Sequence, residues 1–349
     1  MKTEKLQFDL PPELIAQHPL AARSDSRLLV LNRSDGRITD SRFSRLGKFL
    51  SPGDCLVLND TKVLPARFFA RRATGGKIEG LFLAEEAPRL WRILLKPARR
   101  IRPGDQLYLK DRQKRDFCTA VVCAKGDDGM YRLKVDTGDG IEAALDKIGF
   151  PPLPPYIKRR DNLAEAEADK LRYQTVYARE PGAIAAPTAG LHFTEHLIGQ
   201  LREYGINFAY ITLHVGTGTF KPIVTENLEE HQIHQERFSV DEENAQLINQ
   251  AKDKGHRIVA VGTTSARTLE TVASGSEVKP AAGTTGLFIK PGYKFQIVDA
   301  MITNFHLPRS TLLALVAAFA GLESILATYQ HAIEHRYRFY SYGDAMLIT

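Results

Sequence analysis

A series of short apolar segments between residues 62 and 155 constrains the fold of this chain most strongly. They recur at intervals of about 11–15 residues, separated by Gly, Asp and Pro, a spacing typical of a small antiparallel barrel or sandwich. The segments include Phe68–Ala70, Gly80–Leu83, Trp91–Leu95, Gln106–Leu109, Cys118–Val122 and Tyr131–Val135. The proline-rich stretch 151–155 follows them and is a stiff linker.

Strand and helix patterns alternate outside that stretch. Buried strands are predicted at 28–31 and 55–58, and further strands at 207–213, 257–261, 286–288 and 300–303. Helices are predicted over 163–177, 194–204, 241–254, 265–273, 312–320 and 323–335. This alternation favours a parallel-rich α/β layer or barrel. We therefore expect a discontinuous, barrel-like α/β domain of residues 1–61 and 156–349, with an inserted antiparallel β-barrel domain of residues 62–155.

The net charge of +6 is unevenly distributed along the chain. Residues 62–160 contain 22 Lys or Arg against 12 Asp or Glu, whereas the remainder contains 25 against 29. Such asymmetry favours a polyanionic partner such as RNA or DNA, although a solvated loop face is the alternative. The candidate phosphate contacts are Lys96, Arg99, Arg100, Arg102, Lys158, Arg159 and Arg160.

Several classes of protein are disfavoured by what the sequence lacks. The most apolar stretch, 312–322, is about half the length that a membrane-spanning helix needs. The first residues lack the apolar core of a signal peptide, so we expect a cytoplasmic protein. The chain has three cysteines and no CxxC pair, so we expect no metal site.

Polar residues follow the second predicted strand directly. Asn59, Asp60 and Thr61 come after the apolar run that ends at Leu58. The carboxyl ends of strands are where α/β folds place their ligand sites. Asp60 is therefore a candidate to hold a ribose hydroxyl or to pair with Arg67, and an Asx-turn is the structural alternative.

Two later loops each contain a histidine. His192 lies in the segment 187–194, at a predicted strand-to-helix junction, where a histidine is a good candidate acid or base. A lone histidine is nevertheless more often structural. His214 precedes a Gly-Thr-rich turn whose backbone N–H groups can face a carboxylate or phosphate. The accompanying candidates for substrate binding are Thr188, Phe193, Gly216, Thr217 and Gly218.

Three further segments add polar groups of the same kind. His231, His234 and Glu236 lie close together, and hydrogen bonding to a substrate is favoured over metal binding. Arg267 is poorly placed for the dipole of the helix it enters, which indicates that it serves an anion or a carboxylate. Thr263 and Thr264 precede it, and Asn304 and His306 follow another predicted strand. Several predicted strand ends therefore carry polar groups of the same kind, and their agreement indicates one active site.

Seven segments of the chain, taken together, closely resemble the S-adenosylmethionine:tRNA ribosyltransferase-isomerases of the queuosine pathway. They extend from about Leu10 to Ile348, with Met301 in place of a Phe of the family. The segments are LPPELIAQHPLAARSDSRLLVL, GDCLVLNDTKVLPAR, YQTVYAREPGAIAAPTAGLHFT, ITLHVGTGTFKPI, GTTSARTLE, MITNFHLPRSTLL and RFYSYGDAMLI.

The resemblance implies an α/β domain with an inserted β-barrel domain and a particular reaction. The ribosyl part of S-adenosylmethionine is attached to 7-aminomethyl-7-deazaguanine at the wobble position of a tRNA. Epoxyqueuosine forms, and adenine and methionine are released. It also implies that no metal or cofactor is needed beyond S-adenosylmethionine, which is a substrate. We expect a monomer whose partners are this tRNA and S-adenosylmethionine.

A mechanistic hypothesis assigns roles within that reaction. The sulfonium acidifies the C5′ protons, a base removes one of them, and adenine then leaves with the help of a proton donor. The candidate acids and bases are His192, His214 and His306, with Asp60 or Glu236 as orienting carboxylates. Phe193, Phe220 or Phe305 is expected to face the sulfonium, and Arg267 to hold the methionine carboxylate.

Two alternatives stay open on the sequence alone. A tRNA methyltransferase would use the same substrate and release S-adenosylhomocysteine, although the chain lacks a glycine-rich loop after its first strand. A non-catalytic RNA-binding protein would explain the basic segment, but it leaves the polar strand ends unexplained.

Overall fold

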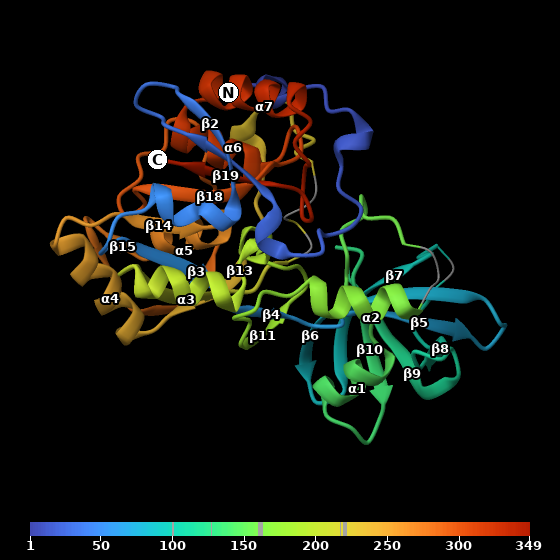
Figure 1. Cartoon of the computed structure of the whole chain (residues 1–349). Coiled ribbons are helices and arrows are strands. Elements are labelled where there is room, and N and C mark those ends of the chain that lie inside the picture. Colours follow the sequence, from blue (N-terminus) through green and yellow to red (C-terminus); the bar gives the residue numbers. More distant parts are fainter. Residues whose placement is uncertain (100, 127, 160–162, 217, 219–221) are drawn as a thin grey trace. The chain divides into compact units, whose positions relative to one another are not determined.

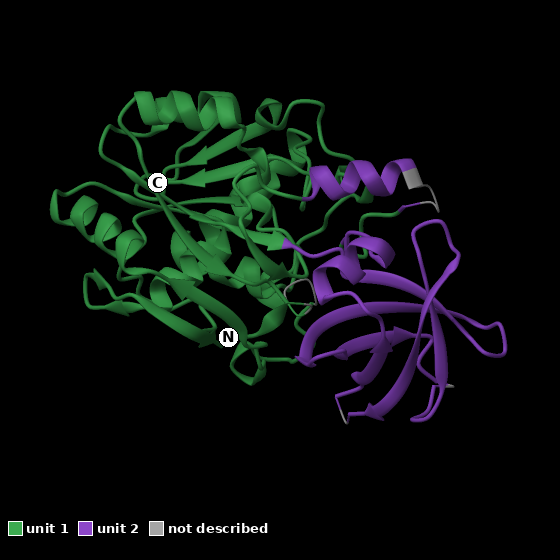
Figure 2. Ribbon diagram, turned by 90° about the horizontal axis from the view of Figure 1, so that it is seen from below, with its two compact units in different colours: residues 1–62, 154–158, 174–349 green, residues 63–153, 159–173 purple. Residues whose placement is uncertain are grey.

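The computed structural model describes residues 1–99, 101–126, 128–159, 163–216, 218 and 222–349 (Figure 1). The chain forms two compact units (Figure 2). The first, the sheet unit, contains Met1–Lys62, Pro154–Lys158 and Gln174–Thr349. The second, the barrel unit, contains Val63–Leu153 and Arg159–Tyr173.

A nine-stranded mixed sheet forms the centre of the sheet unit. Its strands, in spatial order, are β17 (Ala281–Thr285), β13 (Glu236–Val240), β12 (Asn207–Leu213), β3 (Cys55–Asn59), β14 (Ile258–Val261), β18 (Ala300–Asn304), β19 (Ala345–Ile348), β1 (Arg27–Leu31) and β2 (Ile38–Arg42). The four strands β12, β3, β14 and β18 are mutually parallel. Their carboxyl ends therefore lie at one edge of the sheet.

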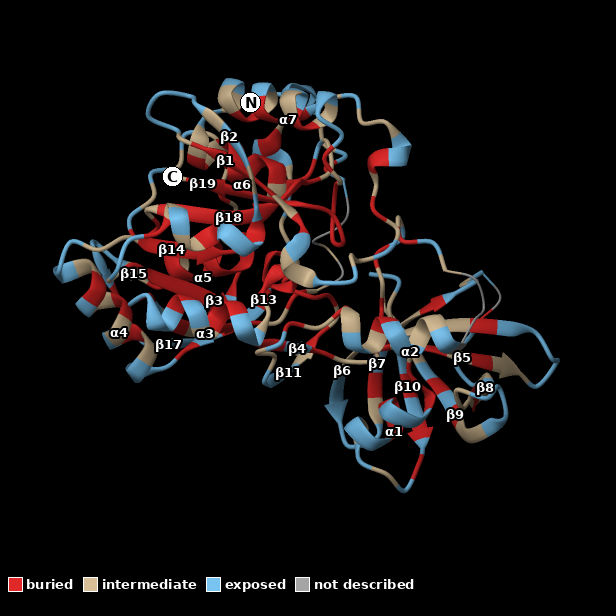
Figure 3. Ribbon diagram, viewed as in Figure 1, coloured by how far each residue is buried: buried red, intermediate tan, exposed pale blue. Residues whose placement is uncertain are grey.

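Both faces of this sheet are covered, which explains its continuous apolar runs. Cys55 and Val57 of β3 face a core with helices α4 (Glu242–Asp253), α5 (Thr263–Thr271), α6 (Thr311–Ala320) and α7 (Leu322–Glu334). Leu56 and Leu58 face the opposite core, with the 3₁₀ helix Phe43–Phe49 and helix α3 (Glu195–Glu203). Figure 3 shows the central strands as a buried layer. Every residue of β3 is thus enclosed.

The barrel unit is built from six antiparallel strands that close on themselves. They are β5 (Arg67–Arg72), β6 (Lys77–Ala87), β7 (Leu90–Lys96), β8 (Gln106–Lys110), β9 (Asp116–Lys125) and β10 (Tyr131–Asp136). Strand β10 alternates buried and exposed residues, with Tyr131, Leu133 and Val135 in the barrel core. Helices α1 (Ile141–Ile148) and α2 (Leu163–Arg172) belong to the same unit.

The predicted α/β class with an inserted antiparallel barrel is confirmed. We predicted a barrel-like α/β domain. Among the described residues, the larger sheet is open, with β17 and β2 as its edge strands. The strand predicted at 286–288 is wrong, because the chain pairs with β13 through 281–285 instead. The Leu287 N–H then donates to the Thr285 hydroxyl, which turns the backbone out of the sheet.

Four short strands lie outside the two sheets. Strand β11 (Glu180–Ala183) pairs with β4 (Thr61–Val63), and β15 (Ala273–Ser274) pairs with β16 (Glu277–Val278). No single described helix is long and apolar enough to cross a membrane. Helices α6 and α7 meet that criterion only as a pair, and they are bent by 112° at their junction.

Candidate active site

Three adjoining hollows lie beyond the carboxyl ends of β14 and β18, and we call them together the strand-end trough. Leu312 of α6 lines all three. The polar residues that line them include Thr188, Glu236, Thr263, Thr264, Arg267, Thr303, Asn304 and His306. Polar side chains from four separate segments of the chain are therefore brought to one place. The segments 263–267 and 303–306 lie at strand ends as predicted, whereas Glu236 is the first residue of β13.

His192 is buried beside the trough and uses both of its ring nitrogens. Nδ1 lies 2.8 Å from the Ser26 hydroxyl and Nε2 lies 3.1 Å from the Asn304 amide nitrogen. Burial lowers the pKa of His192 to about 4. The imidazole is therefore neutral at pH 7.

His306 lines two of the three hollows. Its Nε2 lies 2.7 Å from the Thr303 hydroxyl, and its backbone N–H donates to the Tyr329 hydroxyl. Its Nδ1 makes no hydrogen bond within the part of the chain that the structure describes. Burial lowers the pKa of His306 to about 3, so this imidazole is also neutral at pH 7.

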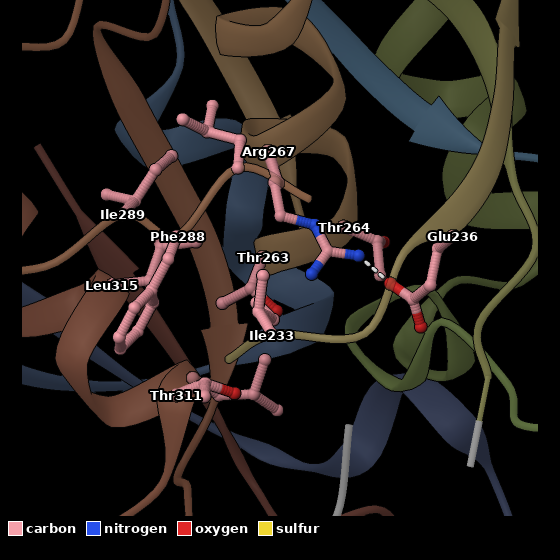
Figure 4. Close-up of a pocket in the computed structure, with 11 residues that line it drawn as sticks. Ile233, Glu236, Thr263, Thr264, Arg267, Phe288, Ile289, Thr311 and Leu315 are labelled. Atoms are coloured by element: carbon pink, nitrogen blue, oxygen red, sulfur yellow. Dashed lines mark ion pairs between the residues drawn. The ribbon is translucent and has the colours of Figure 1, made fainter. Parts of the chain in front are cut away.

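Glu236 and Arg267 form a buried ion pair at the other end of the trough (Figure 4). The Gly216 N–H donates to the Glu236 carboxylate at 2.6 Å. Burial lowers the pKa of Arg267 to about 10, so the guanidinium remains charged at neutral pH. Arg267 thus serves a carboxylate, as its unfavourable position for the helix dipole indicated.

Asp60, Thr61 and His214 form a separate group after β3 and β12, and none of them lines the trough. The Thr61 hydroxyl lies 2.8 Å from Nδ1 of His214. Burial lowers the pKa of His214. Asn59 uses its amide to hold the backbone of Leu213, at 2.9 and 3.0 Å. Asn59 therefore has a structural role in joining the two strands.

Asp60 is paired, but not with the residue that the sequence suggested. Its carboxylate accepts hydrogen bonds from Arg179 and from the Thr212 hydroxyl, each at 2.7 Å. Burial nevertheless raises the pKa of Asp60. Arg67 belongs to the barrel unit and pairs with Glu79 at 2.7 Å. Spacing along the chain could not have revealed Arg179, which lies more than a hundred residues after Asp60.

The two described aromatic residues proposed for the sulfonium are buried, although Phe305 also lines one hollow of the trough. Phe193 and Phe305 are fully buried. Phe193 packs on Phe43, and Phe305 packs among Tyr329, Tyr337 and Phe339. Phe220 and Thr217 lie outside the described residues, whereas Gly218 approaches the ring of His234 closely. The rings of Phe193 and Phe305 therefore belong to the hydrophobic cores of the sheet unit.

The predicted phosphate contacts divide between the two units. Lys96, Arg99 and Arg102 are exposed on the barrel unit, while Lys158 is exposed on the sheet unit. The Arg159 guanidinium is held by Asp169 at 2.6 Å and is only 11% exposed. Arg100 and Arg160 lie outside the described residues. No cluster of three His, Cys, Asp or Glu side chains suited to a metal ion occurs in the described ranges.

Two residues that sequence reasoning missed complete the surroundings of His192 and Asn304. Ser26 contacts His192, and the Tyr340 carbonyl accepts a hydrogen bond from the Asn304 amide at 3.2 Å. Tyr340 has a φ of 70°, which is uncommon for a residue other than glycine. Its place in the segment RFYSYGDAMLI was the one available signal, because the segment matched the family without an assigned role.

A family model described as a queuosine biosynthesis protein matches residues 3–348. The chain belongs to the queuosine biosynthesis protein family. Two relatives are named S-adenosylmethionine:tRNA ribosyltransferase-isomerase. One from Carboxydothermus hydrogenoformans is 50% identical and one from Francisella tularensis subsp. novicida is 47% identical, each over 100% of both chains.

A solved structure supports the same assignment. The crystal structure of S-adenosylmethionine tRNA ribosyltransferase from Thermotoga maritima is 38% identical to this chain, with a TM-score of 0.56. The match covers 99% of this chain and 100% of that one. The family predicted from seven sequence segments is thus confirmed, and this member of it is an enzyme.

Proposed function

We propose that this chain transfers and isomerises the ribosyl moiety of S-adenosylmethionine onto 7-aminomethyl-7-deazaguanine at the wobble position of a tRNA. Epoxyqueuosine-tRNA forms, and adenine and methionine are released. Relatives named S-adenosylmethionine:tRNA ribosyltransferase-isomerase match the chain over its full length, which supports the ribosyl transfer. The observation that carries the proposal is the strand-end trough, which joins a buried ion pair to a neutral imidazole in one site.

His306 is the residue best suited to move the proton. It lines the trough and keeps Nδ1 without a hydrogen bond among the described residues, whereas both nitrogens of His192 are engaged. A neutral imidazole can accept the acidified C5′ proton of the sulfonium substrate. Because burial lowers the pKa of His306, the neutral imidazole is a weak base and the imidazolium that it forms is a strong acid. It can therefore return that proton to the departing adenine.

The remaining parts of the proposal concern partners. Lys96, Arg99 and Arg102 are exposed and are proposed to contact tRNA phosphates. The target base is proposed to be extruded into the active site, as in other enzymes that modify a base. The reaction requires no group beyond S-adenosylmethionine, which is consumed as a substrate. The protein is proposed to act as a monomer.

Product analysis tests this function directly. Purified protein is mixed with S-adenosylmethionine and a tRNA that carries 7-aminomethyl-7-deazaguanine, and free adenine, methionine and tRNA mass are measured. Adenine release in step with the tRNA mass gain is expected. S-adenosylhomocysteine would instead identify a methyltransferase. No turnover, together with salt-sensitive tRNA binding, would identify a binding protein.

The role of His306 is tested in the same assay. We expect His306→Ala to lower adenine release by about 10²–10⁴-fold, the usual contribution of a general acid or base. His196→Ala is the matched control, because His196 is exposed on α3 and does not line the trough. Unchanged turnover in folded His306→Ala would rule out the assigned proton transfer.

A further inference from the structure

One hollow of the trough, which we call the Arg267 pocket, has a polar side and an apolar side (Figure 4). The polar side is formed by Glu236, Arg267, Thr263 and Thr264. The apolar side is formed by Ile233, Leu287, Phe288, Ile289 and Leu315. In Figure 4 the guanidinium lies between the apolar side chains and the carboxylate. A ligand in this pocket therefore meets charges at one end and hydrocarbon at the other.

The charged end has unused hydrogen-bonding capacity. The side chains of Arg267 and Glu236 are 9% and 4% exposed. Nε of Arg267 and the Thr264 hydroxyl have no hydrogen-bond partner within the described residues. Buried polar atoms in proteins are nearly always paired, so unpaired ones that line a pocket point to a ligand. An ion pair enclosed in this way also gains most from additional hydrogen bonds.

The two charges restrict what that ligand can be. An anion alone would be repelled by Glu236, and a cation alone would be repelled by Arg267. A molecule with adjacent carboxylate and ammonium groups satisfies both, because a guanidinium binds carboxylates through charge-assisted hydrogen bonds. The apolar side then accepts an unbranched hydrocarbon or thioether chain, and Phe288 offers an aromatic ring near a sulfur-centred cation.

We propose that the Arg267 pocket binds the α-amino-acid end of S-adenosylmethionine, with the carboxylate on Arg267 and the ammonium on Glu236. This assignment rests on the proposed function, which supplies that substrate. The same contacts are available to free L-methionine. L-Methionine therefore binds the protein without tRNA and competes with S-adenosylmethionine as a product inhibitor.

Calorimetric titration of the full chain with three probes tests the pocket. The probes are L-methionine, 4-(methylsulfanyl)butanoate, which lacks the ammonium, and 3-(methylsulfanyl)propylamine, which lacks the carboxylate. L-Methionine is expected to bind most tightly. Each missing charge is expected to weaken binding roughly ten- to a hundredfold, the usual range for a hydrogen bond to a charged group.

Two charge-removing variants give a crosswise pattern that general unfolding cannot produce. Arg267→Gln is expected to weaken the binding of L-methionine and of the butanoate, while the amine binds as tightly as before or more tightly. Glu236→Gln is expected to weaken the binding of L-methionine and of the amine. The butanoate is expected to bind more tightly, because the carboxylate that repels it has been removed. Arg257→Gln is the matched control, since it breaks another buried-carboxylate pair, with Asp54, at the opposite end of β14. It should leave all three affinities unchanged.

The assignment would be overturned if both variants lost affinity equally for all three probes. It would also be overturned if L-methionine bound no more tightly than the butanoate. Adenine release by the wild-type protein is measured in parallel. If adenine is released without the crosswise pattern, the pocket assignment fails and the proposed function stands. If the crosswise pattern appears without adenine release, the pocket is an amino-acid site and the proposed function fails.

Discussion

At the scale of single residues, His192 is fixed in one tautomer by its neighbours. The Asn304 amide nitrogen donates to Nε2 of His192 and to the Tyr340 carbonyl. Nε2 is therefore an acceptor, so Nδ1 carries the proton and donates it to Ser26. This arrangement leaves the Asn304 amide oxygen, which has no partner among the described residues, as a buried acceptor beside the trough. His192 thus holds the Asn304 amide in one orientation.

A pair of substitutions separates this positioning role from proton transfer. His192→Gln keeps an acceptor for the Asn304 amide, and we expect its kcat/KM to stay within about tenfold of wild type. His192→Leu leaves a buried donor unpaired, which costs about 1–3 kcal/mol, so we expect a loss of roughly 10–100-fold. Because burial lowers the pKa of His192 to about 4, the wild-type rate should show no ionisation of His192 between pH 6 and 8. Equal loss in both folded variants would mean that the imidazole itself is required.

At the scale of secondary structure, continuous apolar runs located the central strands from sequence alone. Segments 55–58 and 257–261 could be predicted because both of their faces are buried. The strand at 281–285 was missed because it is an edge strand with four exposed residues of five. Ion pairs between residues far apart in the sequence, such as Glu236 with Arg267, could not be predicted from local pattern either. Local pattern predicts which residues lie at strand ends, and only the tertiary fold decides which of them meet.

The short strand β11 shows how closely the backbone is fitted to the separate group that contains His214. Gly182 has a φ of 150°, and a Cβ there would lie 2.7–3.0 Å from three atoms of the His214 ring. We therefore expect Gly182→Ala to displace His214 from Thr61 and to lower the free energy of unfolding by about 1–3 kcal/mol. Urea denaturation measures the change in the free energy of unfolding. Adenine release measures whether the displacement of His214 affects turnover. Gly199→Ala in α3 is the control: a Cβ there meets nothing, so stability should stay unchanged or rise by up to about 1 kcal/mol. Similar behaviour of the two variants would contradict the predicted contact.

At the scale of the whole molecule, the basic charge of the barrel unit is only partly available to a partner. Arg71 is held by Asp116 at 2.6 Å, and Arg112 is held by Glu167 at 2.7 Å. Lys96, Arg99 and Arg102 are exposed, and their side chains form no ion pair within the described ranges. Charge counting along the sequence indicated a polyanionic partner, and only the structure separates neutralised cations from free ones.

That distinction predicts how salt should affect tRNA binding. A cation that contacts a phosphate releases counterions, so each lost contact reduces the slope of log affinity against log salt by about 0.7–0.9. We expect the double variant Arg99→Ala, Arg102→Ala to reduce that slope by about 1.4–1.8, measured by filter binding over a range of salt concentrations. Arg71→Ala removes one arginine of the same unit whose charge is already compensated by Asp116, so its slope should match that of wild type. A slope that falls by the same amount per removed arginine in both proteins would show that net charge, and not these exposed arginines, attracts the tRNA.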